Sequence, residues 1–221
     1  MNENLKKIHE YLIGRGNKEE DVLEFDKYSV YLSMEIMEYA HRNQTRENGE
    51  EYANHPSRVM QSYRDMVGIT PHDPFCIDSD LLFDNGIPYE GAQEVALLHD
   101  VIEDTEFTIE DVRQIFIDCD LGSFFDMYIK VPLEFITHDK TMPYDDYIDI
   151  CLKNRTSALV KMLDLQDNLH VIDLIKFDEK NFKRSANYLG YIYLINSCYH
   201  FIENTEKYRQ KFKENNIWNT Y

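Results

Sequence analysis

The stretch VALLHDVIEDTEFT, residues 95–108, places four apolar residues directly before His99 and Asp100. Glu103 and Asp104 follow within about one helical turn. An imidazole and three carboxylates cost free energy to bury unless they are paired or coordinate a metal ion. The stretch therefore predicts one of two structures: a helix end that runs out into solvent, or a helix that presents these groups to an ion.

The spacing of these four residues suits the second structure. Side chains four positions apart share a face of a helix, so His99 would stack with Glu103 and Asp100 with Asp104. The adjacent His99 and Asp100, about 100° apart around the axis, can both reach an ion placed between them. One turn further, Glu103 and Asp104 would then lie near that ion as acids suited to proton transfer. We expect a single helix over residues 91–104.

Other ligands for such an ion have to come from other segments of the chain. His55 stands at the start of a predicted helix in YANHPSRVM, where it is alternatively explained as a capping or surface histidine. Asp164 falls amid an apolar run in SALVKMLDLQDNLHVI and shares a helix face with Asn168. A carboxylate in that position needs an ion or a cationic partner, and Lys161 and Arg155 are the alternative partners.

Composition and periodicity indicate an all-α protein of one domain. Only 8 glycines and 6 prolines interrupt 221 residues, and 43% of the residues are hydrophobic, enough for one sizeable core. Apolar residues recur at helical spacing. Residues 68–90 form an irregular excursion, and Thr108 with Asp111 suggests a capping box. Helices are predicted over residues 26–42, 55–67, 91–104, 109–119, 121–137, 144–153, 156–176 and 179–206.

The charge of the chain limits its partners. With 41 Asp and Glu against 23 Lys and Arg, the formal net charge is -18. This field repels nucleic acid and anionic membrane surfaces, so we expect neither as a partner. A small phosphorylated metabolite remains compatible, because a metal ion or a local group of cations can reverse the sign at one site.

The cysteines and the N-terminal segment indicate a cytoplasmic protein. The four cysteines are widely spaced and form no C-x-x-C pair, which argues against a disulfide framework or a zinc knuckle. The N-terminal segment lacks the apolar core of a signal peptide, and no apolar run approaches the roughly 18 residues of a membrane span. The two long final helices, rich in Tyr and Leu, are expected to supply core and a face for homo-oligomer formation.

Three motifs in this order resemble those of the HD-domain metal-dependent phosphohydrolases, and more narrowly the Rel/Spo-type guanosine tetraphosphate (ppGpp) hydrolases. They are AHRNQTRENGEEYANHP at 40–56, ALLHDVIEDT at 96–105 and VKMLDLQDNL at 160–169. The segments HDKTMP at 138–143 and KRSANYLGYIY at 183–193 are similar to segments of small single-domain alarmone hydrolases. The resemblance implies one HD domain over residues 1–221, with a core at about 26–195, an insertion at about 68–90 and a C-terminal helix at about 179–206.

The resemblance also implies roles for individual residues. It assigns one divalent ion, usually Mn²⁺, to four ligands, and two acids to activating the attacking water or relaying its proton. It places five residues near a nucleotide substrate, among them an arginine that packs on the guanine base, where a planar guanidinium is suited to stacking. The ligands are His55, His99, Asp100 and Asp164; the acids are Glu103 and Asp104; the substrate residues are Arg46, Asn168, Arg184, Tyr188 and Lys140.

The implied activity is removal of the 3′-pyrophosphate from ppGpp or pppGpp, which gives GDP or GTP and pyrophosphate. Three departures from the family pattern concern the choice of substrate: the excursion at 68–90, Glu47 where a basic residue is common, and His170-Val171 where full-length enzymes carry Arg-Thr. These departures favour one alternative, an HD-domain phosphatase acting on another nucleotide, such as NADPH or a nucleoside monophosphate. A second alternative is a catalytically silent module that senses nucleotides, against which the presence of Glu103 and Asp104 argues.

Overall fold

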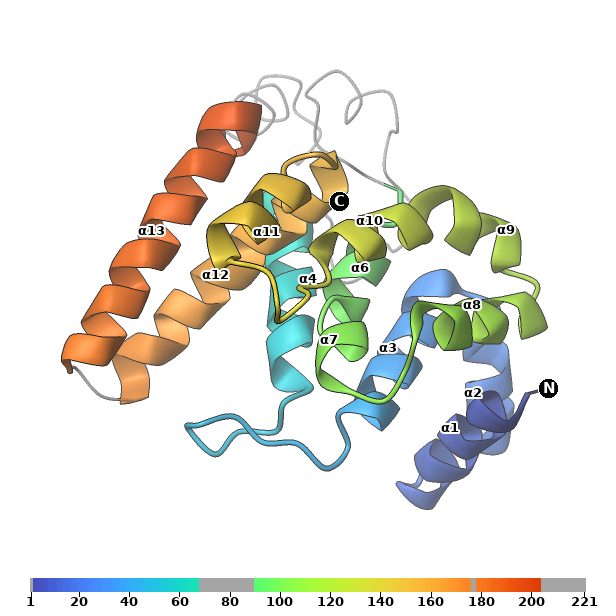
Figure 1. Cartoon of the computed structure of the whole chain (residues 1–221). Helices are drawn as coiled ribbons and strands as arrows, with labels where there is room; N and C mark the ends of the chain where they lie inside the picture. The colour runs from blue at the N-terminus through green and yellow to red at the C-terminus, as the bar shows by residue number, and fades with distance from the viewer. Residues whose placement is uncertain (1, 68–89, 176–177, 204–221) are drawn as a thin grey trace, which may run out of the picture.

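The computed structural model describes residues 2–67, 90–175 and 178–203 of the chain (Figure 1). Within these ranges the chain is helical, and the β pairing is limited to an isolated bridge between Thr45 and Glu51. The predicted all-α class is therefore confirmed. The insertion expected at 68–90 lies outside the described residues except for its last position, Glu90.

Four helices form the N-terminal part of the bundle. Helix α1 begins with a side-chain cap, because the Asn2 carboxamide oxygen accepts the Leu5 N–H at 2.8 Å. Both α1 and α2 lie N-terminal to the first helix that the periodicity predicts, whereas α3 and α4 match the helices predicted at 26–42 and 55–67. The four helices are α1 (Glu3–Gly14), α2 (Glu19–Phe25), α3 (Ser29–Ala40) and α4 (Asn54–Val67).

The centre of the bundle is α6 (Ala92–Leu98), which contacts α3, α4 and the long helix α12 (Arg155–Ile175). All residues of α6 except Gln93 are buried, so this helix lacks a solvated face. A helix that is apolar nearly all round is stable only when other elements enclose it. Helices α3, α4 and α12 therefore pack around α6, and His99 and Asp100 follow at its C-terminal end.

The helix predicted over residues 91–104 is divided in two. Regular α-helix ends at Leu98, His99 and Asp100 form a turn, and α7 (Val101–Asp104) follows. The cause lies in the His99 side chain, whose Nδ1 lies 2.8 Å from the Ala96 carbonyl oxygen. In an uninterrupted helix that carbonyl would accept the backbone N–H of Asp100. The prediction of one continuous helix is therefore wrong, although Glu103 and Asp104 still follow the His-Asp pair by one short helix.

The next helices agree with the predicted ranges 109–119 and 121–137. Helix α8 (Ile109–Asp118) begins with the predicted capping box, in which Thr108 and Asp111 exchange side-chain and backbone hydrogen bonds. The second range contains α9 (Gly122–Phe124), a π-helical segment η1 (Phe125–Ile129) and α10 (Lys130–Ile136). Pro132 has no N–H to offer the Tyr128 carbonyl four residues earlier, which accounts for the irregular turn.

Gly91, the residue before α6, lies directly against that irregular turn. Its φ of 75° is in the left-handed region, and a Cβ added there would meet the Tyr128 carbonyl oxygen at 2.5 Å. We expect Gly91→Ala to lower the free energy of unfolding by about 2–4 kcal/mol through backbone strain and overpacking. Urea unfolding followed by circular dichroism measures this difference.

Gly190, on the exposed side of α13 (Glu179–Tyr199), provides the matched control. A Cβ added there meets no atom within 4 Å, so Gly190→Ala should raise the free energy of unfolding by about 0.5–1 kcal/mol. Equal unfolding midpoints for Gly91→Ala and the wild-type protein would contradict the close approach of Gly91 to Tyr128.

The C-terminal part consists of α11 (Tyr144–Cys151), α12 and α13, which confirms the helices predicted at 144–153 and 156–176 up to residue 175. The helix predicted over 179–206 is interrupted after Tyr199, because His200 adopts a left-handed conformation with φ 53°. Residues 201–203 are helical again, and 204–206 lie outside the described residues. His200 donates its N–H to the Asn196 carbonyl, and the buried Phe201 ring stacks on Tyr199. A left-handed residue of this kind is a common helix terminus.

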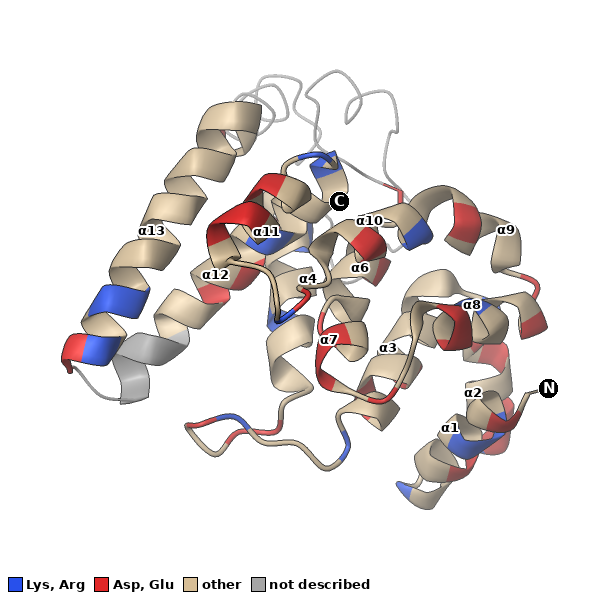
Figure 2. Cartoon of the chain, in the orientation of Figure 1, with Lys and Arg blue, Asp and Glu red and all other residues tan. Residues whose placement is uncertain are grey.

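The surface of the bundle is acidic, with an apolar stripe on one helix. Figure 2 shows acidic residues on α1, α2, α7, α8 and α11, and no broad basic area in this view of the described residues. Helix α13, at the opposite side of the bundle from α1 and α2 (Figure 1), exposes several large apolar side chains. None of the described helices is long and apolar enough to cross a membrane. The exposed apolar side chains of α13 are Phe182, Leu189, Tyr193 and Leu194.

Candidate metal centre and catalytic site

Four side chains predicted as metal ligands converge where α4, α6 and α12 meet. His55 comes from the first turn of α4, His99 and Asp100 from the turn after α6, and Asp164 from the middle of α12. His55 Nε2 lies 3.0 Å from Asp164 Oδ1 and 3.5 Å from Asp100 Oδ2. His99 Nε2 lies 3.3 Å from Asp100 Oδ1 and 3.8 Å from Asp164 Oδ1. Three helices remote in sequence thus bring two imidazoles and two carboxylates together.

The orientation of both imidazoles suits a cation. The Nδ1 atom of His99 bonds to the Ala96 carbonyl, and the Nδ1 atom of His55 lies 2.7 Å from Asp167 Oδ2. Because these acceptors take the Nδ1 protons, the Nε2 lone pairs of the neutral rings face the cluster. His99 Nε2 is buried and has no hydrogen-bond partner among the described residues. One ligand atom from each of His55, His99 and Asp164 lies within 4.8 Å of the other two. Together with the neighbouring Asp100 carboxylate they suit a divalent ion of borderline hardness, so the cluster is a candidate divalent metal site.

The protonation states of the cluster support this assignment. Burial lowers the pKa of His99, but the Asp100 and Asp164 carboxylates outweigh it and raise this pKa to about 9. Burial raises the pKa of Asp164, but Lys161 and the two histidines outweigh it and hold this pKa well below its usual range. Protons on the imidazoles thus offset the negative charge in the absence of a cation. A divalent ion can take over that role, with release of those protons.

Lys161, the alternative partner for Asp164, is also part of the arrangement. Its ammonium group is buried, donates to Asp164 Oδ2 at 2.8 Å, and lies 5.1 Å from the centre of the Tyr147 ring. The other alternative, Arg155, lies over the rings of Tyr199 and Phe201. Asp164 therefore directs one carboxylate oxygen to Lys161 and the other to the two histidines.

Asp167, one turn after Asp164 on α12, contacts His55 on the side away from the cluster, although no role for it was predicted. It accepts hydrogen bonds from His55 Nδ1 at 2.7 Å and from Arg58 Nε at 2.6 Å, and it lies 3.3 Å from an Arg46 nitrogen. A carboxylate behind a ligating histidine fixes the orientation of the ring and raises its basicity. The i, i+3 spacing from Asp164 is the only sequence signal for it.

The contact between Asp167 and His55 makes a testable prediction. Asp167→Asn should weaken binding of a divalent ion about 10- to 100-fold, because the amide holds His55 less strongly than the carboxylate does. Isothermal titration with Mn²⁺ measures the affinity. Asp149→Asn, which removes an exposed carboxylate on α11, is the matched control and should leave the affinity unchanged. Equal affinities for the two variants would contradict a supporting role for Asp167.

The two predicted proton-transfer acids lie beside the cluster in different environments. Glu103 is half-buried and accepts the backbone N–H of His138 at 3.2 Å. Burial raises the pKa of Glu103, which suits a group that accepts a proton near neutral pH. One carboxylate oxygen of Asp104 accepts a hydrogen bond from the Lys140 ammonium at 3.1 Å, and the other accepts one from the Tyr52 hydroxyl at 3.0 Å.

Tyr52 is a further residue of the site that sequence reasoning did not find. Its hydroxyl lies 2.9 Å from Asp100 Oδ2 as well as 3.0 Å from Asp104 Oδ2, so it bridges the metal cluster and the acid pair. Its ring stacks on the buried His41, with the ring centres 4.6 Å apart. The tyrosine lies three residues before His55, within the motif at 40–56, and that position is the signal that could have indicated it.

The predicted substrate residues on the loop between α3 and α4 and on α12 contact each other. Arg46 donates to Asp167 at 3.3 Å and to the Asn168 carboxamide oxygen, and its guanidinium lies 5.9 Å from the centre of the Tyr52 ring. The nitrogen of the same carboxamide donates to Asp164 Oδ1 at 2.6 Å. Asn168 therefore connects the loop that carries Arg46 to the metal cluster.

The remaining predicted substrate residues surround the same region. Arg184 on α13 lies 3.7 Å from Glu47 and 3.1 Å from the Asn181 side chain. Tyr188 is half-buried, and burial together with the negative charge of Asp164 raises the pKa of its hydroxyl. With Arg46 and Lys140 as described, each of the three predicted substrate cations already contacts a carboxylate of the protein.

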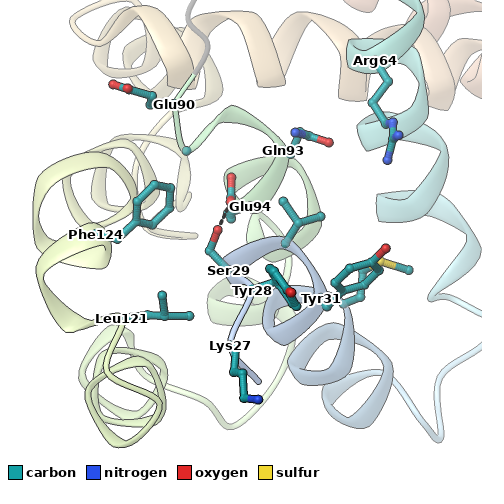
Figure 3. Close-up of a pocket in the computed structure, with 13 residues that line it drawn as sticks. Lys27, Tyr28, Ser29, Tyr31, Arg64, Glu90, Gln93, Glu94, Leu121 and Phe124 are labelled. Atoms are coloured by element: carbon teal, nitrogen blue, oxygen red, sulfur yellow. Dashed lines mark hydrogen bonds between the residues drawn. The ribbon is translucent and has the colours of Figure 1, made fainter. Parts of the chain in front are cut away.

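A separate cavity of about 340 Å³ lies near the opposite end of α6, between α3, α4 and the segment around α9. Figure 3 shows that Ser29 and Glu94 point toward each other within it, and the hydroxyl donates to the buried carboxylate at 2.5 Å. Phe124 and Tyr28 form part of its wall. The cavity contains none of the predicted site residues, so it is distinct from the metal cluster.

The described helices form an all-α bundle, with the His-Asp turn at its centre. One similar solved structure is a metazoan ortholog of SpoT, described as hydrolysing ppGpp and playing a role in starvation responses. The match has a TM-score of 0.56 at 20% sequence identity and covers 83% of this chain and 96% of that one. No family model and no curated protein matches the chain. The likeness establishes the fold that the sequence predicts.

Proposed function

We propose that this chain is a metal-dependent phosphohydrolase that removes the 3′-pyrophosphate of ppGpp or pppGpp, giving GDP or GTP and pyrophosphate. The observation that carries the proposal is the convergence of His55, His99, Asp100 and Asp164 within a fold shared with a protein described as hydrolysing ppGpp. We also propose a cytoplasmic setting, and self-association through the exposed apolar side chains of α13.

The proposed cofactor is one Mn²⁺ ion held by those four residues. Imidazole and carboxylate ligands together suit this ion, and its bound form supplies a water of lowered pKa and positive charge for phosphoryl oxygens. The protein orients the ligands through groups behind them. Ala96 and Asp167 hold the two imidazoles, and Tyr52 holds Asp100.

In the proposed reaction Glu103 accepts the proton of the attacking water. Its raised pKa and its hydrogen bond to the His138 N–H keep a carboxylate poised beside the cluster. Asp104 is the second acid of the pair and accepts hydrogen bonds from the Tyr52 hydroxyl and the Lys140 ammonium. The proton can then pass within one acid pair, without reorganisation of the ligands.

The proposed substrate contacts use the residues around the cluster. Arg46 and Asn168 would meet the nucleoside, and Arg184, Tyr188 and Lys140 would meet sugar and phosphate groups. Lys140 is well exposed, and an exposed ion pair contributes at most about 1 kcal/mol, so a phosphate can displace its Asp104 partner at small cost. Arg46 is mostly buried and keeps its partners, which suits packing against a base.

A second candidate function follows from the pairing of these cations. Arg184 lies opposite Glu47, and a carboxylate at this position repels a distal phosphate. A nucleotide with fewer charges, such as NADPH or a nucleoside monophosphate, would meet less repulsion. The reaction type and the metal cluster would be the same, and only the substrate would differ.

Incubating the purified full chain with Mn²⁺ and a panel of ppGpp, pppGpp, NADPH and nucleoside monophosphates tests both functions. Pyrophosphate released from ppGpp and pppGpp alone is the expected result. Phosphate released from another member of the panel, without pyrophosphate from ppGpp, would support the second candidate. Nucleotide binding with no turnover of any member would contradict both and support a nucleotide-sensing module.

A further inference from the structure

A second cluster of potential ligands lies at the N-terminal end of the bundle, outside the proposed active site. It consists of His9 on α1, Asp26 directly after α2 and Glu35 on α3. His9 Nε2 lies 3.0 Å from Asp26 Oδ2 and 3.2 Å from Asp26 Oδ1. One ligand atom from each of the three residues lies within 4.8 Å of the other two.

Within this cluster, one carboxylate oxygen of Glu35 is buried without a hydrogen-bond partner. Glu35 is only 7% exposed, and its Oε2 atom has no hydrogen-bond partner among the described residues. No described lysine or arginine forms an ion pair with Glu35 or with the neighbouring Asp26. Burial and the Asp26 carboxylate raise the pKa of Glu35 to about 8. The buried Glu35 carboxylate and the partly buried Asp26 carboxylate thus share one imidazole.

We propose that His9, Asp26 and Glu35 bind a divalent transition-metal ion, of the class represented by Zn²⁺. An imidazole nitrogen and two carboxylate oxygens form a common zinc ligand set, in which neighbouring ligand atoms lie about 3.4 Å apart for bond lengths near 2.1 Å. The present separations require only small side-chain movements to reach that geometry. The site is independent of the proposed ppGpp chemistry.

The position of the site indicates a structural role. Its three residues come from α1, the end of α2 and α3, so one ion would link three consecutive segments. Helix α3 also contacts α6, the central helix of the bundle. A cation bound to the folded chain alone stabilises it by mass action. The ion would therefore stabilise the packing of α1 and α2 against α3 and the core.

Counting bound zinc in the full chain and in single variants tests the proposal. Each protein is stripped with a chelator, loaded with Zn²⁺, desalted and analysed by mass spectrometry of the metal. Glu35→Gln and His9→Gln should each retain one zinc ion fewer per chain than wild type. The exposed neighbour variant Glu10→Gln should retain the wild-type number. Because only the difference is scored, the result does not depend on how many ions the central cluster binds.

Thermal unfolding adds a readout that a purely structural carboxylate would not give. Above pH 8 the buried Glu35 is charged and Glu35→Gln removes that charge, so at such a pH its metal-free form should unfold several degrees above the metal-free wild type. Zinc should raise the midpoint of wild type and Glu10→Gln by more than it raises that of Glu35→Gln. Equal zinc counts and equal zinc-dependent shifts in wild type and Glu35→Gln would overturn the proposal.

Discussion

Asp164→Asn is expected to abolish binding of a divalent ion at the central cluster and to reduce ppGpp hydrolysis about a thousandfold or more. Asp164 Oδ1 faces His55 at 3.0 Å and His99 at 3.8 Å, so it lies between the two imidazoles. Metal catalysis contributes several kcal/mol of transition-state stabilisation, and each 1.4 kcal/mol corresponds to about a factor of ten in rate. Mn²⁺ titration and initial rates measure the two losses.

This variant also removes the counter-charge of the buried Lys161. Breaking a buried ion pair by removing one partner typically costs about 3–5 kcal/mol, so Asp164→Asn should be markedly less stable. The double variant Asp164→Asn with Lys161→Met removes the stranded ammonium and should recover stability without recovering metal binding. Metal binding of wild-type affinity in the stable double variant would contradict the assignment of Asp164 as a ligand.

Glu103→Gln is expected to retain the metal ion and to lose turnover by about 100- to 10,000-fold, the usual contribution of a general base. Glutamine has nearly the same shape and can still accept the His138 N–H, so the fold and the four metal ligands should be unaffected. Mn²⁺ affinity and kcat, measured on the same preparation, separate this outcome from that of Asp164→Asn.

Glu106→Gln is the control for Glu103→Gln. Glu106 is exposed and lies three residues further along the chain, so its substitution should change neither kcat nor metal affinity. A Glu103→Gln protein with full kcat would show that Glu103 is not the base. The role would then pass to Asp104, whose carboxylate lies between Tyr52 and Lys140.

The convergence of the four predicted ligands could be anticipated from the sequence because three of them carry a local signal and the motif at 40–56 indicates His55. Asp164 lies in an apolar run, and His99 with Asp100 follows four apolar residues. Buried polar groups of this kind need partners, and the family motifs supplied the order of those partners. In contrast, the contact of Asp167 with His55 joins positions 112 residues apart, and no local pattern encodes it.

The helices differ from the predicted ranges for local physical reasons. The helix predicted over 91–104 is interrupted because the His99 side chain bonds to the Ala96 carbonyl, a competition that helical periodicity cannot register. The helix predicted over 179–206 is interrupted after Tyr199 because His200 adopts a left-handed conformation. Helices α1 and α2 carry many charged residues, which obscures their helical periodicity. His9 on α1 and Asp26 after α2 become neighbours only when the two helices pack together.

The buried Lys161 has a consequence for the order in which ligands bind at the central cluster. Above the raised pKa of His99, where both imidazoles are neutral, Asp100, Asp164 and Lys161 together carry one net negative charge, which repels a phosphate. With a divalent cation in place, the same groups carry one net positive charge and attract it. At such alkaline pH, phosphate compounds should therefore bind weakly to the metal-free chain, and their affinity should report how much of the protein is loaded with metal. Binding of the anion would then require prior binding of the cation, because the internal ammonium group alone leaves the cluster negative.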